Sequence, residues 1–420
     1  MKFFLFSTLL LAASVPLFAE PSHYITGGHK PLSPAVQAEL DVRAESIRLG
    51  LNTEFLERAG FDAESFAQVV IDTVDQLPKL RTPGVVIYVD SIVQENIPIA
   101  LGNRMVTPEK HPMEWSTYFD LGTLTAPVVT LPFLLNTMEQ KRLPLNQVVE
   151  MSFPSSNTID YSSQMPLLLG DLTRYSVQWN HRDEELLGGS KFFGELTPVP
   201  LRNSSVPHPS DWVNNLEVLS LALAYDNELT TETTPLKTRF FEEIALPLGM
   251  VNTSMDTVPD AWRSLVSPGA LNRFHGRMPW GEAYAPIPFL LKEESVGGGM
   301  FSTADDLGIY ARYWLLTSEL GSEDFFSTQT LKISTQLQGF KDDVPHGHIW
   351  QLGQFGTESF GFTGTDGRAL WMDPRHGVFC VILMNPEHLQ GNRPKNMQPA
   401  VNALVQRLHR TLLAHKRSNI

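Results

Sequence analysis

The sequence is poor in the features that would cross-link the chain or attach it to nucleic acid. It contains one cysteine, Cys380, so no intramolecular disulfide can form. Basic residues are the minority, with 32 Lys and Arg against 46 Asp and Glu and a formal net charge of −14. This balance argues against nucleic acid and anionic membrane surfaces as partners.

Sequence motifs for cofactors are missing as well. There is no glycine-rich phosphate loop ending in lysine, no cysteine pair and no dinucleotide fingerprint after a strand. No cofactor is therefore expected. Cys380 lies in the apolar run 377–383, which is typical of a buried strand, and we interpret its thiol as a small buried hydrophobe and not as a nucleophile.

A long apolar run occurs only at the N-terminus. Residues 1–19 combine Lys2, an apolar stretch and the small residue Ala19, which is the pattern of a signal peptide cleaved after Ala19. Ser14 and Pro16 interrupt the stretch, which falls short of the roughly 20 residues that span a bilayer. The predicted product is secreted or periplasmic, with no membrane span after signal removal.

The rest of the chain has the patterning of a folded protein with a large core. The full chain has 420 residues, of which 42% are hydrophobic, and this is enough apolar surface for such a core. We expect helices at 33–51, after Asp62, and at 124–141, 215–223, 234–246, 306–316 and from about Met397, with strands at 85–89, 348–352, 369–372 and 378–384. Strands near both ends predict one sheet assembled from the two ends of the chain.

Six short strings follow one another in the order found in one known family. They are Gly60-Phe61-Asp62, Pro83-Gly84-Val85, residues 119–125, residues 246–250 with Thr253, Gly298-Gly299 with residues 302–307, and Gly361-Phe362-Thr363-Gly364. On these strings the chain resembles the serine β-lactamase and penicillin-binding-protein hydrolases, in particular class C β-lactamases, from about residue 60 to the end.

The resemblance implies a β-lactamase-like α/β (α+β) sandwich, in which helices flank an antiparallel sheet, a helical region is inserted, and a cleft separates the two parts. The expected division is a signal peptide at 1–19, an N-terminal helical extension at 20–59, an α/β part at 60–152 and 289–420, and an inserted helical and loop region at 153–288.

The family's catalytic motif is Ser-x-x-Lys at the start of the central helix, where a lysine one turn after the serine can take the hydroxyl proton. The corresponding positions here are Thr123 and Ala126. Thr123 keeps a hydroxyl, but the methyl group of Ala126 cannot accept a proton. Pro127 is favourable only in the first turn of a helix, so we expect the helix to start with Thr125 as its N-cap and to leave Thr123 outside.

The other two motifs of the family also differ here. Tyr-x-Asn is best matched by Trp212-Val213-Asn214, whose indole cannot accept a proton, although Asn214 could hold a peptide carbonyl or cap a helix. Lys-Thr-Gly or His-Thr-Gly reads Phe362-Thr363-Gly364, without a cationic or protonable group. The resemblance implies degenerate catalytic positions at Thr123, Ala126, Trp212 and Phe362, and binding positions at Thr123, Trp212, Asn214, Thr363 and Gly364.

One histidine pair is a weak candidate for metal binding. His346 and His348 lie on one face of an extended segment and would need a third ligand to hold an ion. A strand beside the cleft is the simpler interpretation, so no metal site is predicted.

Three functional hypotheses follow. The first is an exported pseudoenzyme that binds a cell-wall peptide or a protein partner through a remnant groove without acyl transfer. The alternative is an atypical esterase or peptidase that uses Thr123 or an unrecognised nucleophile. In the third, Trp212 and Phe362 fill the groove and the molecule acts through its outer surface. Loss of nucleophile or base costs a serine protease about a millionfold in turnover, which favours the first hypothesis over the alternative.

Overall fold

The structure is a computed structural model, and it describes the following residues: 47, 50–93, 95, 97–141, 151–152, 158–159, 178–179, 198–199, 219, 223, 234–271, 275–285, 288–289, 292, 295–320, 327–341, 344–390 and 396–412. The predicted signal peptide lies outside these residues, as do Trp212, Asn214 and most of the segment predicted as an insertion.

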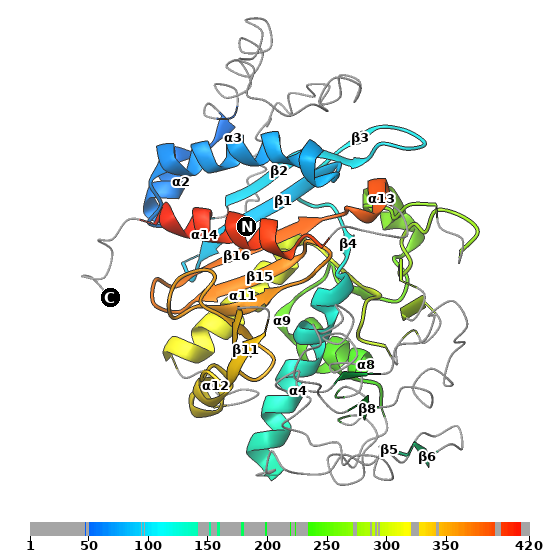
Figure 1. Cartoon of the computed structure of the whole chain (residues 1–420), viewed down its shortest axis with the longest axis vertical. Helices are drawn as coiled ribbons and strands as arrows, with labels where there is room; N and C mark the ends of the chain where they lie inside the picture. The colour runs from blue at the N-terminus through cyan, green and yellow to red at the C-terminus, as the bar shows by residue number, and fades with distance from the viewer. Residues whose placement is uncertain are drawn as a thin grey trace, which may run out of the picture.

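A nine-stranded sheet forms the centre of the molecule (Figure 1). Its order is β11-β12-β13-β14-β15-β16-β1-β2-β3, and neighbouring strands run antiparallel. The strands are β1 (Gly84–Ser91), β2 (Ile97–Met105), β3 (His111–Pro112), β11 (Gly339–Lys341), β12 (Val344–His346), β13 (Gln351–Leu352), β14 (Phe360–Thr363), β15 (Ala369–Asp373) and β16 (Val378–Met384). Because β1 pairs with β16, the prediction of one sheet built from both ends of the chain is confirmed.

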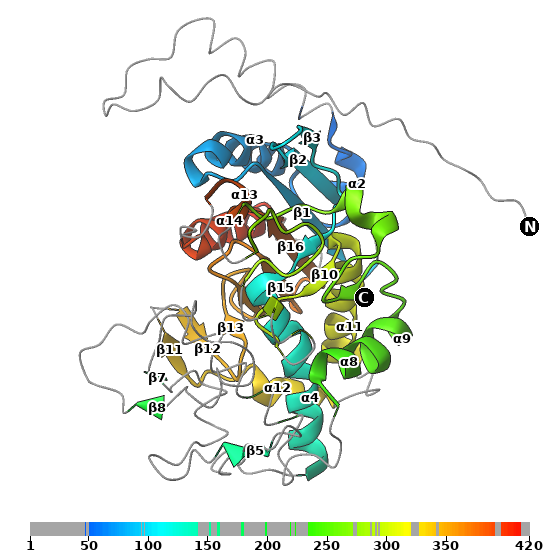
Figure 2. The same cartoon turned by 90° about the vertical axis from the view of Figure 1, so that its right-hand side faces the viewer.

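The central strands of this sheet, β14, β15, β16 and β1, are buried on both faces, and alternate side chains enter different cores. On β1, Val86 and Tyr88 belong to one hydrophobic cluster, whereas Val85 and Ile87 belong to a second. Helices α4 (Thr125–Lys141) and α11 (Ala304–Leu320) contribute to the first cluster; α2 (Thr53–Arg58), α3 (Ala63–Leu80) and α14 (Gln398–Arg410) contribute to the second (Figures 1 and 2). The fold is therefore a sheet covered by helices on both faces, as predicted.

Smaller elements surround the first cluster. A three-stranded sheet has the order β4 (Phe119–Asp120), β10 (Met300–Ser302) and β9 (Ser254–Met255). The remaining elements are the 3-10 turns η2 (Gly122–Leu124) and η5 (Asp260–Leu265), the π-helical turn η4 (Phe241–Ala245), helices α8 (Leu236–Phe240), α9 (Leu246–Leu248), α12 (Thr328–Ser334) and α13 (Glu387–Gln390), and the strand pairs β5 (Met151–Ser152) with β6 (Thr158–Ile159) and β7 (Gln178–Trp179) with β8 (Pro198–Val199).

Several local predictions are confirmed. Asp62 caps α3 by accepting a hydrogen bond from the Ser65 N–H at 2.8 Å. The apolar helix predicted at 124–141 is α4, and the last helix begins at Gln398, one residue after Met397. Cys380 is fully buried in β16, and burial raises the pKa of its thiol. None of the helices in the described ranges is both long and apolar enough to cross a membrane.

Candidate functional site

Thr123 lies in the short turn η2, which connects β4 to α4. Helix α4 begins at Thr125, so Thr123 is outside it, as predicted. The prediction that Thr125 caps the helix is wrong: its φ and ψ of −54° and −45° are helical, and its buried hydroxyl has no hydrogen-bond partner among the described residues. The turn η2 runs directly into α4 and takes the place of a cap. Pro127 lies in the first turn of α4, where proline is tolerated.

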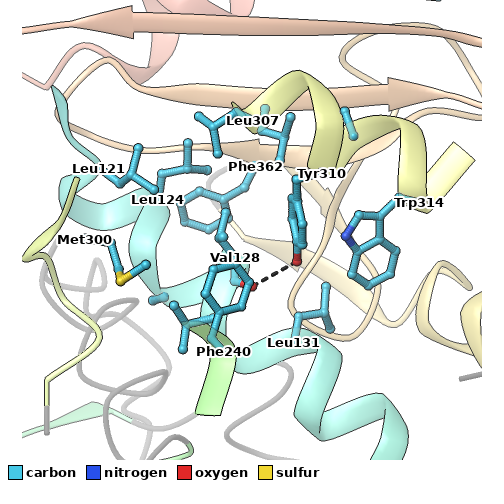
Figure 3. Packing of buried hydrophobic residues seen from close by; sticks show 14 of the residues in the cluster. Leu121, Leu124, Val128, Leu131, Phe240, Met300, Leu307, Tyr310, Trp314 and Phe362 are labelled. Atoms are coloured by element: carbon cyan, nitrogen blue, oxygen red, sulfur yellow. Dashed lines mark hydrogen bonds between the residues drawn. The ribbon is translucent and has the colours of Figure 1, made fainter. Parts of the chain in front are cut away.

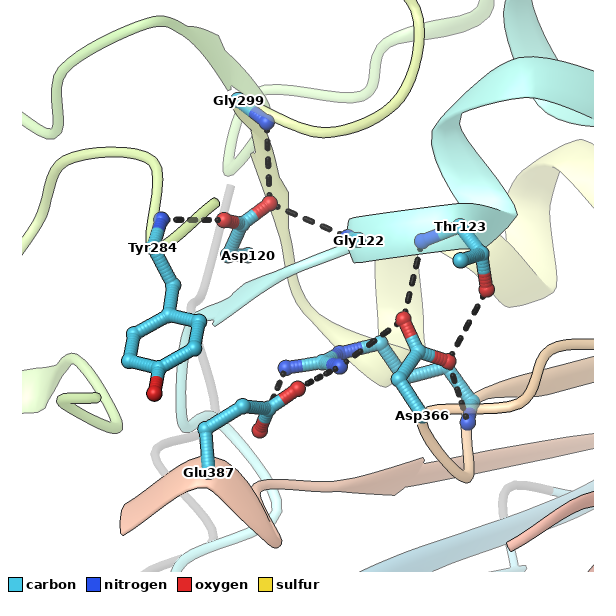
Figure 4. Close-up of polar contacts among 8 residues, drawn as sticks. Asp120, Gly122, Thr123, Tyr284, Gly299, Asp366 and Glu387 are labelled. Carbon is cyan, nitrogen blue, oxygen red and sulfur yellow. Dashed lines mark hydrogen bonds and ion pairs between the residues drawn. The ribbon is translucent and has the colours of Figure 1, made fainter. Parts of the chain in front are cut away.

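The Thr123 side chain points at a carboxylate that sequence reasoning missed. Its hydroxyl donates a hydrogen bond to Asp366 Oδ1 at 3.0 Å, and its backbone N–H donates to Asp366 Oδ2 at 2.8 Å (Figure 4). Asp366 lies in the turn between β14 and β15 and is 8% exposed. A carboxylate in this position favours the start of the helical segment, because the first N–H groups of a helix have no partner within it.

Two glycines let the β14–β15 turn approach Thr123 this closely. A Cβ on Gly364 would lie 2.0 Å from Thr123 Oγ1, and a Cβ on Gly122 would lie 2.2 Å from Asp366 Oδ2. Gly122 also has a φ of +52°, which side chains with a Cβ rarely adopt. Gly364, predicted as a binding residue, is thus in contact with Thr123, and its lack of a side chain makes room for the Thr123 hydroxyl.

Arg368 and Glu387 hold Asp366 in place from behind. Arg368 Nη1 lies 3.0 Å from Asp366 Oδ2 and 2.7 Å from Glu387 Oε1, and Arg368 Nη2 donates to Glu387 Oε2 at 3.3 Å. All three side chains are at least nine-tenths buried. Burial opposes the charge of Arg368, but the carboxylates of Glu387 and Asp366 raise the pKa of its guanidinium above the usual range. The result is a buried carboxylate, guanidinium and carboxylate in series (Figure 4).

A second carboxylate, Asp120, borders the same turn on its other side. Asp120 Oδ1 accepts hydrogen bonds from the N–H groups of Gly122 at 3.0 Å and Gly299 at 2.9 Å, and Oδ2 accepts one from the Tyr284 N–H at 3.1 Å. Figure 4 shows these three segments converging on Asp120. Asp120 therefore joins two of the strings that carry the family resemblance, residues 119–125 and Gly298-Gly299.

Apolar side chains occupy the two positions that the sequence resemblance aligns with the family's cations. Phe362 is 2% exposed and packs with Leu121, Leu124 and Tyr310 in the cluster between the sheet and α4 and α11 (Figure 3). Ala126 is fully buried in the same cluster. A charged group at either position would lie among hydrocarbon, where it costs several kcal/mol unless it is paired.

Thr363 is on the opposite face of β14 from Phe362. It is fully buried, and its hydroxyl accepts a hydrogen bond from the Trp371 indole at 2.8 Å. Its backbone N–H donates to the Gln351 side chain, and its carbonyl accepts from Gln398 at the start of α14. These contacts fix β14 against its neighbours and do not bring the Thr363 hydroxyl to Thr123. Its binding role remains a prediction.

A small cavity adjoins the buried ion pairs. It is lined by Asp120, Tyr284, Arg368, Asn385 and Glu387 among others, and its volume of about 10 Å³ is close to the room that one water molecule needs. Burial, together with the nearby charge of Glu387, raises the pKa of the Tyr284 hydroxyl to about 12.

The histidine pair considered in the sequence is buried. His346 is 3% exposed and His348 is 1% exposed, and neither belongs to a group of three potential metal ligands among the described residues.

Comparison with known proteins agrees with this geometry. A family model described as Beta-lactamase matches residues 227–403. This match covers fewer than half of the 420 residues, and over it the chain is similar to the β-lactamase family. The resemblance to serine β-lactamases and penicillin-binding proteins and the predicted fold class are both confirmed. No curated protein matches the chain in sequence.

Solved structures share the fold of this chain over most of its length. Simvastatin synthase LovD from Aspergillus terreus is 15% identical, with a TM-score of 0.56, and the match covers 85% of this chain and all of LovD. EstCE1, described as a hydrolase with promiscuous acyltransferase activity, is 16% identical, with a TM-score of 0.53 and coverage of 82% and 99%. At this level of identity the likeness establishes the fold and not the chemistry.

Proposed function

We propose that this β-lactamase-related chain is an exported pseudoenzyme that acts by binding and does not transfer acyl groups. One observation carries the proposal: Asp366 accepts hydrogen bonds from both the hydroxyl and the N–H of Thr123. These two groups are the ones that acyl transfer through Thr123 would have to use.

The charge of Asp366 opposes the reaction at its critical step. When a hydroxyl attacks a carbonyl, negative charge develops on the carbonyl oxygen and must be met by hydrogen-bond donors. The N–H nearest to the attacking oxygen is that of Thr123, and it already donates to a carboxylate. A fixed negative charge at that donor would raise the energy of an oxyanion, because like charges repel most strongly where water is scarce.

The usual base for the hydroxyl is absent as well. The residue one turn after Thr123 is Ala126, a buried methyl group within the apolar cluster. Nucleophilic catalysis by a hydroxyl needs an adjacent group that takes its proton. The molecule therefore keeps the family's fold, while the side chains that would act as nucleophile and base are replaced.

One contact favours the alternative, an atypical esterase or peptidase. The Thr123 hydroxyl lies 3.0 Å from a carboxylate oxygen, which is within reach for proton transfer, and the solved structures with this fold are described as a synthase and a hydrolase. Against it, the same carboxylate is already paired with a buried cation, because Arg368 Nη1 lies 3.0 Å from Asp366 Oδ2.

Hydrolysis measurements separate the two candidates. We would follow a chromogenic ester and a chromogenic cephalosporin with the wild type, Thr123→Ala and Asp366→Asn. The pseudoenzyme proposal expects all three proteins to match the buffer rate. Turnover by the wild type that disappears in both variants would establish Thr123 as a nucleophile with Asp366 as its base.

The proposed ligand is a cell-wall peptide or a protein partner. Calorimetric titration with soluble muropeptides tests the first, and we expect saturable binding that releases no product. Binding that is unchanged in Trp212→Ala and Asn214→Ala would place the contact outside the predicted groove and favour the hypothesis that the outer surface acts, in which the buried Phe362 helps to fill the groove.

Export is proposed from residues 1–19. Cell fractionation of the full chain beside a chain lacking these residues tests it, with the expectation that only the full chain leaves the cytoplasm and loses about 19 residues.

A further inference from the structure

A second cluster of ionisable side chains lies at the other end of β15 from Asp366. It consists of Asp373 at the end of β15, His376 in the turn to β16, and His409 in the last turn of α14. β15 has five residues, so at about 3.3 Å per residue the strand separates this cluster from the Thr123 turn by roughly 16 Å. The cluster is thus independent of the site described above.

We propose that Asp373, His376 and His409 form a binding site for a divalent transition-metal ion, with zinc as the ion that suits it best. Imidazole nitrogens and carboxylate oxygens are typical zinc ligands, and two histidines with one carboxylate make up known three-ligand zinc sites.

The geometry of the three ligand atoms fits such an ion. Asp373 Oδ2 lies 2.5 Å from His376 Nδ1 and 3.0 Å from His409 Nε2, and the ligand atoms all lie within 4.8 Å of one another. In a tetrahedral site with bonds of about 2.1 Å, ligand atoms stand roughly 3.4 Å apart. The two spacings from Asp373 Oδ2 are shorter than that value, so side-chain rotations that move the imidazoles slightly outward make room for one ion among the three atoms.

The carboxylate is held ready for this role. Asp373 Oδ1 accepts the Arg375 N–H at 2.8 Å, which leaves Oδ2 directed at the two imidazoles. A contact of this kind to the second carboxylate oxygen orients a metal ligand. The Arg375 side chain turns elsewhere and lies 3.4 Å from Glu358.

The two histidines of the cluster are partly exposed, so an ion can reach the site from solvent. The Asp373 side chain is 1% exposed, whereas His376 and His409 are 29% and 23% exposed. An ion would therefore sit on a buried anchor with both imidazoles at the surface and solvent available for a fourth ligand. Phe355 packs against the His409 ring, with centroids 5.3 Å apart, and limits its movement.

Gly356 keeps the inner side of the cluster open. A Cβ on this residue would lie 2.5 Å from His409 Nε2 and 2.9 Å from Asp373 Oδ2. Any larger residue would push into the ligand atoms.

Bound metal would tie the C-terminal helix to the sheet. His376 and His409 belong to the hairpin turn and to α14, so an ion held by both joins the two elements. An ion that binds the folded chain and not the unfolded one stabilises the fold.

The test is a titration of the tag-free chain, stripped with EDTA, with zinc chloride by calorimetry. We expect one ion per chain and a rise in the thermal unfolding midpoint on adding zinc. In His376→Asn and His409→Gln each affinity should fall by at least about tenfold. These replacements keep an N–H that can donate to Asp373, so the hydrogen bonds survive while the imidazole ligands are lost. His111→Asn is the matched control, since His111 is a half-buried histidine beside Glu109 and outside the cluster, and the variant should bind zinc like the wild type.

Two results would overturn the proposal: no saturable zinc binding by the wild type, or equal affinity in the double variant His376→Asn/His409→Gln. A measurement on the wild type covers the case in which the variants fail to fold. Zinc should protect His376 and His409, but not His111, from modification by diethylpyrocarbonate mapped by mass spectrometry; equal modification with and without zinc would refute the site.

Discussion

Asp120 and Asp366 border the same turn from two sides. Each carboxylate accepts a backbone N–H of the turn, but the two residues differ in what else they bind. Asp120 binds the N–H of Gly122, and Asp366 binds the N–H of the next residue, Thr123. The other bonds of Asp120 go to Tyr284 and Gly299, far along the chain. Asp120 therefore holds three segments of the fold together, whereas Asp366 also accepts a hydrogen bond from the Thr123 hydroxyl, which acyl transfer would need.

The contrast separates what the family frame requires from what its chemistry requires. Asp306 makes a similar connection: its carboxylate accepts the Thr253 hydroxyl at 2.7 Å and the Asn252 N–H at 2.8 Å. It so ties a third string, residues 246–250 with Thr253, to the string that contains Gly299. Strings that match the family thus lie where side chains hold segments together. The departures, Ala126 and Phe362, lie where the family's cations would stand.

The largest expected effect concerns Arg368, which keeps Asp366 and Glu387 compensated in the interior. Arg368→Ala leaves two buried carboxylates without their cation, and we expect a loss of about 3–5 kcal/mol in the free energy of unfolding, measured in urea. Arg375→Ala, which removes an exposed arginine paired with Glu358, is the control and should cost about 0–1 kcal/mol. Similar costs for the two variants would show that Asp366 is not held by this ion pair.

A smaller effect compares the two carboxylates directly. Asp120→Ala leaves three backbone N–H groups from three segments without their acceptor, including the buried Gly299 N–H, and should cost about 3 kcal/mol of unfolding free energy. Asp366→Ala should cost about 1–2 kcal/mol, because Glu387 still pairs with Arg368 and because Thr123 is only half-buried, so that water can replace part of what is lost. The reverse order would make Asp366 the structural joint and contradict the comparison.

The smallest effect is a pH dependence of the stability that arises from Tyr284. Its N–H donates to Asp120, and its hydroxyl lies near the charge of Glu387. Burial and that charge raise the tyrosine pKa from 10.0 to about 12. The unfolded chain therefore ionises first, so this group's contribution to stability is present below pH 10 and is lost as the pH rises toward 12.

Ultraviolet titration of tyrosinate, as the difference between wild type and Tyr284→Phe, should give a midpoint near pH 12. Glu387→Gln should lower this midpoint but not restore 10.0, because burial remains. An unchanged midpoint in Glu387→Gln would mean that the hydroxyl lies out of reach of the carboxylate.

The fold was largely predictable because its elements have strong local signals. Continuous apolar runs of strand length at 85–89 and 378–384 identify buried strands, and the cap at Asp62 identifies the start of α3. The 3-10 turn η2 was not predicted, because a threonine before a proline-containing first turn also fits an N-cap.

The site was only half predictable. Sequence located Thr123, Ala126 and Phe362 by their place in the family's motifs, but it missed Asp366 and Arg368. The available signal was the Asp366-Gly367 pair between two strand-like runs, which predicts a turn. A turn of charged residues is normally solvated, and only the tertiary approach permitted by Gly122 and Gly364 brings this one onto Thr123.

The most direct test of the proposal that Asp366 closes the acyl-transfer position is intact-mass analysis after incubation with a fluorophosphonate and, separately, with a penicillin. The proteins to compare are the wild type and Thr123→Ala, with an active serine esterase as a positive control for the fluorophosphonate and a serine β-lactamase variant that retains its acyl group for the penicillin. We predict unmodified mass for both forms of this chain. An adduct on the wild type that is absent from Thr123→Ala would contradict the proposal and make Thr123 a working nucleophile.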